Sequence, residues 1–172
     1  MKKLILLSLL IVSLLLQSCS VQEKMNSSVF EQAMIDSCDG AITVDENFFK
    51  NGTGYYFVTY NGVSDLLIKT ESDENGNIYN VSVSATAKSL SELNFTAECA
   101  FSVYCPDAEY EEFLADCCGG KDGIFDLESP DYLLNYTCIN GNISVSVLNK
   151  RLAAIRHNGL TLKQNDKNYL HK

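Results

Sequence analysis

The alternation of apolar and polar residues divides the chain into segments with helical periodicity and segments with strand periodicity. In three segments the apolar residues recur every three to four positions, which is the spacing of one buried helix face. This pattern predicts helices over about 28–38, over about 89–105, and from about 109 to the Gly119-Gly120 pair. Gly40 and Pro106 follow the first two segments, and both are residue types that end helices.

The first two helical segments each begin with a capping-box sequence. Ser28-Val29-Phe30-Glu31 and Ser89-Leu90-Ser91-Glu92 both place a serine three residues before a glutamate. In such a box the serine hydroxyl accepts a hydrogen bond from the glutamate amide, and the glutamate carboxylate accepts one from the serine amide. We therefore expect the helices to start at these serines.

Strand signals begin around an Asn-Gly pair. Residues 55–60 are all aromatic or β-branched, and Asn61-Gly62 follows them. This dipeptide suits a type I′ turn, whose two central residues both need positive φ. The return strand is predicted over 63–70, and after a polar turn at 71–77 the residues 78–85 alternate between apolar and polar side chains. Together these segments predict an antiparallel meander with one solvated face.

A second Asn-Gly pair, Asn140-Gly141, predicts a C-terminal hairpin between strands at 132–139 and 143–148. Residues 41–49 indicate a weaker strand that runs into a loop, and the stretch between the third helix and residue 132 is predicted to be a loop. Strands that occur in groups favour an α+β fold. We expect an antiparallel sheet, made of the meander plus the C-terminal hairpin, with the helices packed on one face.

Length and charge fit one acidic domain with a basic tail. We expect a single domain over 28–149, which is long enough for a real core, and a poorly ordered tail over 150–172 that starts with a short helix at 150–157. Residues 20–149 carry 5 Lys/Arg against 21 Asp/Glu, whereas the tail carries 6 against 1. An acidic domain does not attract nucleic-acid phosphates, so no nucleic-acid partner is expected.

The first residues have the parts of an export signal. Met1-Lys2-Lys3 gives a positive start, and an apolar run over 4–16 follows. This run of about 13 residues is shorter than the ~20 that a membrane-spanning helix needs. We therefore expect residues 1–18 to be a removed signal peptide rather than a transmembrane helix.

Leu16-Gln17-Ser18-Cys19 resembles the bacterial lipobox, and the resemblance covers residues 1–19 only. It implies that cleavage follows Ser18, that Cys19 is diacylated on sulfur and acylated on its new amino group, and that residues 19–27 are a tether. Gln17 departs from the small residue often found at that position. Each buried CH₂ contributes ~0.8 kcal/mol, so three acyl chains hold a protein firmly where one does not. The implied location is the bacterial cell envelope, on the outer membrane or its periplasmic face.

A second interpretation is ordinary signal cleavage after Ser20, which discards Cys19. Asn-X-Ser/Thr triplets are glycan acceptors in a eukaryotic secretory pathway, and the chain has six of them. This interpretation gives an extracellular, disulfide-stapled glycoprotein. The acceptor residues are Asn26, Asn51, Asn80, Asn94, Asn135 and Asn142.

Six cysteines remain once Cys19 is lipidated or removed, and an even number in an exported chain permits three disulfides. The alternative is that they are buried thiols that act as small apolar residues. No Cys-x₂-Cys pair is present, and the two histidines, His157 and His171, lie in the tail, so there is no zinc signature. The six are Cys38, Cys99, Cys105, Cys117, Cys118 and Cys138.

The turn at 71–77 has the spacing of a calcium-binding loop, with oxygen-bearing side chains at Glu71, Asp73, Asn75 and Asn77. Two departures count against metal binding. The first position is Glu rather than Asp, and the twelfth is Ser82 rather than a bidentate Glu. An acidic turn between strands is the favoured interpretation, and weak calcium binding is the alternative.

Nothing in the sequence assembles a recognisable catalytic set. There is no Gly-x-Ser-x-Gly motif and no phosphate-binding Gly-rich loop. Glu109, Glu111 and Glu112 fit the solvated face of an amphipathic helix. We expect a non-enzymatic binding or scaffolding module of unknown ligand without a cofactor, and the alternative is an exported hydrolase with no recognisable motif.

Overall fold

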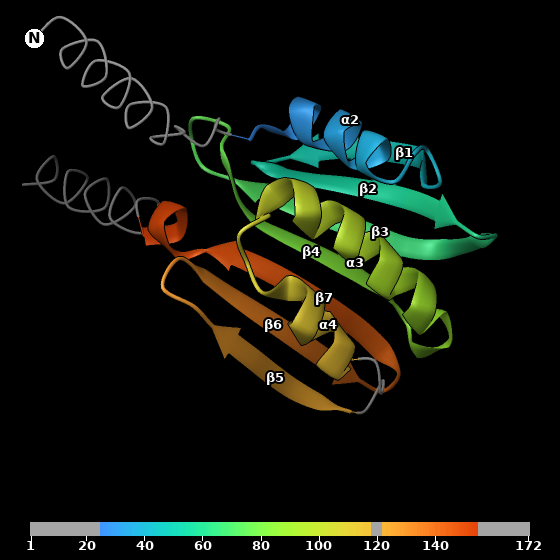
Figure 1. The fold of residues 1–172 in the computed structure, drawn as a ribbon. Helices are drawn as coiled ribbons and strands as arrows, with labels where there is room; N and C mark the ends of the chain where they lie inside the picture. Colours follow the sequence, from blue (N-terminus) through green and yellow to red (C-terminus); the bar gives the residue numbers. More distant parts are fainter. Residues whose placement is uncertain (1–24, 118–121, 155–172) are drawn as a thin grey trace, which may run out of the picture.

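The computed structural model describes residues 25–117 and 122–154 (Figure 1). In chain order the elements are α2 (Ser27–Ser37), β1 (Thr43–Lys50), β2 (Thr53–Tyr60), β3 (Val63–Ser72), β4 (Ile78–Thr86), the short 3₁₀ helix η1 (Ala87–Ser89), α3 (Leu90–Tyr104), α4 (Tyr110–Cys117), β5 (Gly123–Glu128), β6 (Tyr132–Ile139) and β7 (Asn142–Asn149). Residues 150–154 are helical. The expected signal peptide (1–18), Cys19, most of the tether, Cys118 and the tail beyond residue 154 lie outside the described residues.

The strands form one antiparallel sheet in the order β1-β2-β3-β4-β7-β6-β5. The meander occupies one half, and the β6–β7 hairpin joins it through the β4–β7 pair. The predicted α+β class with an antiparallel sheet is therefore confirmed. Strands β1 and β5 are the two edges of the described sheet.

Three two-residue Asn-Gly turns join neighbouring strands. Asn61-Gly62 has φ values of 50° and 78°, and Asn140-Gly141 has 53° and 75°, as a type I′ turn requires. Asn51-Gly52, between β1 and β2, has the same geometry at 54° and 76°. This third turn was not predicted.

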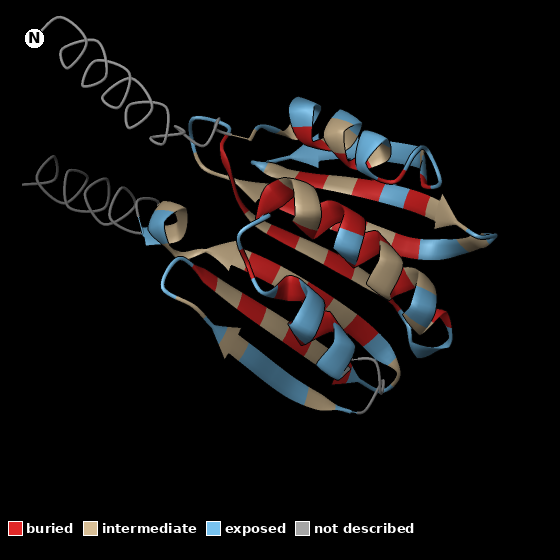
Figure 2. Cartoon of the chain, viewed as in Figure 1, coloured by how far each residue is buried: buried red, intermediate tan, exposed pale blue. Residues whose placement is uncertain are grey.

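Successive residues of a strand point to opposite faces of the sheet. Every second residue of the central strands is buried, so the core forms on one face. Buried and half-buried residues alternate along the central strands (Figure 2). Helix α3 packs against β3, β4 and β7, α2 packs against α3, and α4 packs against α3 and β6. The largest fully buried side chains are Tyr56, Tyr136, Phe30, Phe101, Met34, Ile42, Leu66, Ile68, Ile78, Leu93, Leu134 and Ile143.

Both capping-box predictions are wrong. The N-cap of α2 is Asn26, whose Oδ1 accepts hydrogen bonds from the Val29 amide (3.1 Å) and the Ser28 hydroxyl (2.8 Å). At α3 the Ser89 hydroxyl donates instead to Asp65 Oδ1 at 2.9 Å, and η1 precedes the helix. In both places a nearby carboxylate or amide oxygen competed with the local pattern.

Two further predictions about loops are corrected. Residues 123–128, expected in a loop, form the edge strand β5, and the strand predicted within 41–49 continues to Lys50. Both strands are edges with mostly exposed side chains. Because neither strand buries one whole face, both lack the apolar alternation that identifies a strand in a sequence.

Candidate functional site

Opposite the core, the sheet has a second face that is only partly buried. Small polar residues line its centre. Ser82 pairs with Ser146 and Ser84 with Ser144 across β4 and β7, and the Ser84 and Ser144 hydroxyls are 3.0 Å apart. Rows of hydroxyls of this kind are suited to hydrogen bonding with a partner rather than to core packing. We call this side of the sheet the polar face.

An aromatic patch lies on the polar face at the β1 edge. It consists of Phe48, Tyr55 and Phe57. Strand register places Phe48 opposite Tyr55, and the two rings stack with centroids 4.7 Å apart and planes 17° from parallel. Phe48 also lies 6.1 Å from Phe57, and these two side chains are 43% and 39% exposed. Exposed stacked rings provide apolar contact area at low entropic cost, which is typical of binding surfaces.

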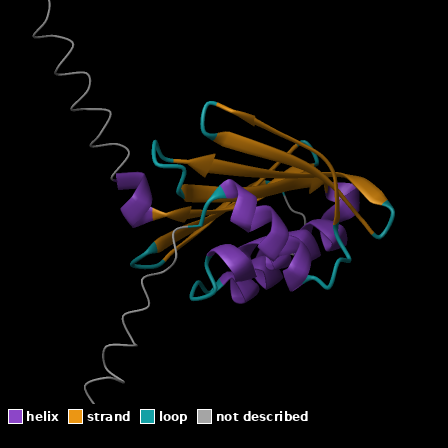
Figure 3. Ribbon diagram, turned by 90° about the horizontal axis from the view of Figure 1, so that it is seen from above, coloured by secondary structure: helices purple, strands orange, loops and turns teal. Residues whose placement is uncertain are grey.

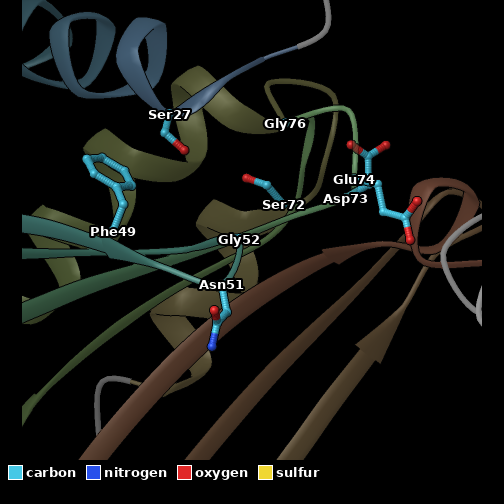
Figure 4. Close-up of a pocket in the computed structure, with 8 residues that line it drawn as sticks. All are labelled: Ser27, Phe49, Asn51, Gly52, Ser72, Asp73, Glu74 and Gly76. Atoms are coloured by element: carbon cyan, nitrogen blue, oxygen red, sulfur yellow. The ribbon is translucent and has the colours of Figure 1, made fainter.

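A cavity of about 490 Å³ lies at the end of the sheet where two turns meet the start of α2 (Figure 4). Figure 4 shows the Ser27 and Ser72 side chains between α2 and the turns, with the Phe49 ring to one side. Ser72 Oγ is buried and lacks a hydrogen-bond partner among the described residues. The lining residues are Ser27, Phe49, Asn51, Gly52, Ser72, Asp73, Glu74 and Gly76.

Glycines fix the shape of this cavity. The Gly52 carbonyl accepts a hydrogen bond from the Ser72 amide at 2.7 Å, which ties the two turns together. At Gly54 a Cβ would lie 2.7 Å from Thr70 Oγ1 and 2.8 Å from the Phe49 ring. Only a residue without a side chain therefore lets Phe49 lie over β2, where its ring meets Tyr56 edge-on at 5.8 Å.

Asp73 organises the β3–β4 turn. Its Oδ1 accepts hydrogen bonds from the amides of Asn75 (2.9 Å) and Asn77 (2.8 Å), and its Oδ2 accepts one from Asn77 Nδ2 (2.9 Å). Asn77 also forms an isolated antiparallel β-bridge with Asn26. The Ile78 amide donates a hydrogen bond to the Met25 carbonyl at 2.9 Å. The start of the described chain is thus held beside the cavity.

The calcium-loop residues are not gathered around one point. Glu71 lies on the polar face, where Oε1 pairs with Lys69 Nζ at 2.7 Å and Oε2 accepts from Asn80 at 3.0 Å. Asp73 instead bonds within its own turn. Within residues 25–117 and 122–154, no three His, Cys, Asp or Glu side chains are grouped so that they could hold a metal ion.

Four of the six candidate disulfide cysteines are buried free thiols in this structure, and they are Cys38, Cys99, Cys105 and Cys138. Burial raises the pKa of Cys99 to about 12, and the neighbouring Cys38 adds to the rise, so α2 and α3 bring these two side chains together. Burial likewise raises the pKa of Cys105 to about 12. Cys118 lies outside the described residues, and Cys117 ends α4.

The predicted glycan acceptors occupy varied positions. Asn51 lies in an exposed turn and Asn142 begins β7, whereas Asn80, Asn94 and Asn135 lie within strands or a helix and are partly buried. Asn135 Nδ2 donates to Asp126 Oδ1 at 2.6 Å. Asn26 caps α2.

The chemistry available at these two surfaces is hydrogen bonding and aromatic contact. His157 and His171 lie outside the described residues, and Glu109, Glu111 and Glu112 flank or begin α4. In the described part of the chain, no helix is long and apolar enough to cross a membrane. The strand that contains Tyr55 and Phe57 was predicted from the sequence. Phe48, Phe49 and Asn51 were not predicted as site residues, although the Asn51-Gly52 turn would have indicated them.

Comparison with known protein families, with curated proteins and with solved structures finds no match to this chain.

Proposed function

We propose that this chain is a lipid-anchored bacterial cell-envelope protein whose acidic α+β domain is a non-enzymatic binding or scaffolding module. The observation that supports this proposal most directly is the lipobox-like sequence Leu16-Gln17-Ser18-Cys19, which follows a positively charged start and a short apolar run. Cys19 would then be the point of attachment to the membrane.

The layer arrangement supports a module with one free surface. In the view from above in Figure 3, the helices α2, α3 and α4 lie together on one side of the strands. We infer that these helices cover one face of the sheet and leave the polar face for a partner. Val81, Val83 and Val145 are buried and lie on β4 and β7, two strands that α3 contacts, which fits this arrangement.

Chain length supports an orientation relative to the membrane. Cys19 precedes Met25 by six positions, and an extended chain spans at most ~3.5 Å per residue, or about 20 Å here. Because Met25 is hydrogen-bonded to Ile78 beside the cavity, the cavity end of the domain would lie near the bilayer. The aromatic patch would then lie on a face at the side of the domain.

Charge supports a domain that stands off from its membrane. The excess of Asp and Glu over residues 20–149 repels anionic lipid head groups. Because the domain is not attracted electrostatically to the membrane surface, its polar face would stay open to partners. The hydroxyl rows and the aromatic patch offer hydrogen bonds and apolar contact to such a partner, whether a protein or a small molecule.

The anchor is tested by fractionating cells that produce Cys19→Ala. We expect this variant to be lost from the membrane fraction or to accumulate with residues 1–18 uncleaved, because a lipobox without its cysteine is not processed. Ser18→Ala is the matched control, since it keeps a small residue at that position and is expected to behave like the wild type. A Cys19→Ala variant that is trimmed and stays with the membranes as before would contradict the proposed function.

A further inference from the structure

We propose that the protein forms a symmetric homodimer through strand β1, in which the β1 strands of two copies pair antiparallel about a twofold axis at Phe48. The two seven-stranded sheets would then be continuous. This inference rests on the geometry and charge of β1 and does not depend on the lipid anchor.

Strand β1 is an open edge with a defined pairing segment. Nearly all of its side chains are exposed, and within the described residues it pairs only with β2. A bulge at Asp45 interrupts the register between Val44 and Glu46. Bulges block edge pairing locally, so the regular edge available to a partner runs from Glu46 to Lys50.

The β1–β2 hairpin decides which backbone groups face outward. Lys50 and Thr53 close the two-residue turn, so they form the first hydrogen-bonded pair, and every second residue of β1 is bonded to β2 in the same way. Lys50, Phe48 and Glu46 therefore direct their N–H and C=O groups toward β2. Asn47 and Phe49 direct theirs away from the sheet, where a second strand can bond them.

One register satisfies both the backbone and the charges. With Phe48 on the axis, Asn47 of one copy faces Phe49 of the other, and both carry outward backbone groups. The same register places Glu46 opposite Lys50 twice, once on each side of the axis. Glu46, Phe48 and Lys50 all lie on the polar face, because Phe48 pairs with Tyr55 there. Opposite charges directly across an antiparallel pair stabilise it.

The other edge lacks this complementarity. Strand β5 carries exposed Ile124 and Phe125, but its charged residues are Asp126 and Glu128, with no cation within the strand. Pairing β5 with itself would form no ion pair between the two strands, and Lys150, which lies beside β5, already pairs with Glu128 at 2.6 Å. The charge pattern therefore assigns the self-pairing edge to β1.

The dimer also explains why Phe48 is exposed. On the twofold axis its ring would meet the same ring of the second copy, and each is already stacked on Tyr55. The two aromatic patches would merge into one apolar strip across the middle of the continuous sheet. Dimer formation would thus cover part of the 43% of Phe48 that is exposed in the single chain.

The register is tested by disulfide cross-linking of the full chain in its native membranes or lysate. Directly opposed residues at a non-hydrogen-bonded site have Cα atoms roughly 4.5 Å apart, within reach of a disulfide. Phe48→Cys is therefore expected to give a covalent dimer on a non-reducing gel after mild oxidation. Phe57→Cys is the matched control, because it is equally exposed on the same face but one strand further from the edge. A dimer band in neither variant, or equal bands in both, would overturn the proposal.

Charge exchange tests the same interface without new cysteines. Glu46→Lys and Lys50→Glu are each expected to weaken dimerisation about ten-fold, because each puts like charges opposite one another. The double variant Glu46→Lys/Lys50→Glu restores opposite charges and is expected to restore the dimer in sedimentation experiments. Glu112→Lys on α4 controls for net charge. Folded single variants that remain dimeric, or a folded double variant that remains monomeric, would overturn this register.

Discussion

Phe48 of β1 stacks on Tyr55 of β2 at a centroid distance of 4.7 Å, on the side of the sheet opposite the core. Two residues along β2, Phe57 continues the same row. Between them, Tyr56 points the other way and is fully buried against Phe30. Neighbouring aromatic residues of β2 thus lie on opposite faces of the sheet. Tyr56 packs in the core, whereas Tyr55 and Phe57 lie on the polar face.

We predict that Phe57→Ser and Tyr56→Ala have very different effects on stability. Phe57 is partly exposed, so its loss is expected to lower the free energy of unfolding by about 1 kcal/mol or less. Tyr56 is buried, and large-to-small changes in a core cost about 3–5 kcal/mol. Urea denaturation of both variants measures the contrast. Similar losses in the two variants would mean that the patch is structural rather than a surface for partners.

Asp65 is predicted to stabilise the junction between β4 and α3 in a pH-dependent way. Its Oδ2 accepts from the Thr86 hydroxyl at 2.7 Å and its Oδ1 from Ser89 at 2.9 Å. The hydrogen bond from the Thr86 hydroxyl is the main reason why the pKa of Asp65 is lowered below its usual value. A lowered pKa gives stability that is present above the unfolded pKa of about 3.9 and is lost as pH falls through the folded value.

Accordingly, Asp65→Ala is expected to lower the free energy of unfolding by about 1 kcal/mol at pH 7. The difference from the wild type should shrink at a lower pH, once the pH has fallen through the folded pKa of Asp65 and the carboxylate is protonated. Thermal or urea unfolding at both pH values measures it. A difference that is the same at both would show that the charge of Asp65 contributes nothing.

The buried thiols are predicted to resist alkylation in the folded protein. The pKa of about 12 at Cys99 and Cys105, raised by burial, keeps both protonated at pH 8, and the thiolate is the reactive form. The associated stability is present below the unfolded thiol pKa of about 8.5 and is lost as pH rises toward the folded value. Peptide mapping after iodoacetamide treatment, with and without denaturant, measures the protection. Rapid labelling of Cys105 in the folded protein would contradict its burial.

Gly54→Ala is predicted to destabilise the cavity wall. Its Cβ would be too close to Thr70 Oγ1 and to the Phe49 ring, and overpacking typically costs about 1–3 kcal/mol. Because Phe49 is 55% exposed, its own replacement by Ala should cost little. The double variant Gly54→Ala/Phe49→Ala should recover part of the loss, which thermal unfolding of the set can detect. Strictly additive effects would show that the ring does not depend on Gly54.

The sequence predicted the middle of the sheet better than its edges. Asn61-Gly62 and the alternation over 78–85 identified β2, β3 and β4, because central strands bury one face and so show period two. The edges β1 and β5 bury little, and their pairing depends on neighbours far along the chain. Residues 41–49 predicted β1 only weakly, and the Asn51-Gly52 turn that joins β1 to β2 was overlooked.

Local motifs also failed where distant side chains competed. Ser89 has the spacing of a capping box, yet Asp65, 24 residues earlier, takes its hydroxyl. The aromatic patch needed the β1–β2 register before Phe48 and Tyr55 could be recognised as neighbours. The cavity needed three segments that are distant in sequence, so no pattern within one segment predicts it.

The mass of the N-terminal peptide of the mature protein tests the central claim most directly. A lipid-anchored protein predicts a peptide that begins at Cys19 and carries three acyl chains, two on a glyceryl group at sulfur and one on the amino group. A mature chain that begins at Val21 with a free amino group, or one that keeps an unmodified Cys19, would contradict the account.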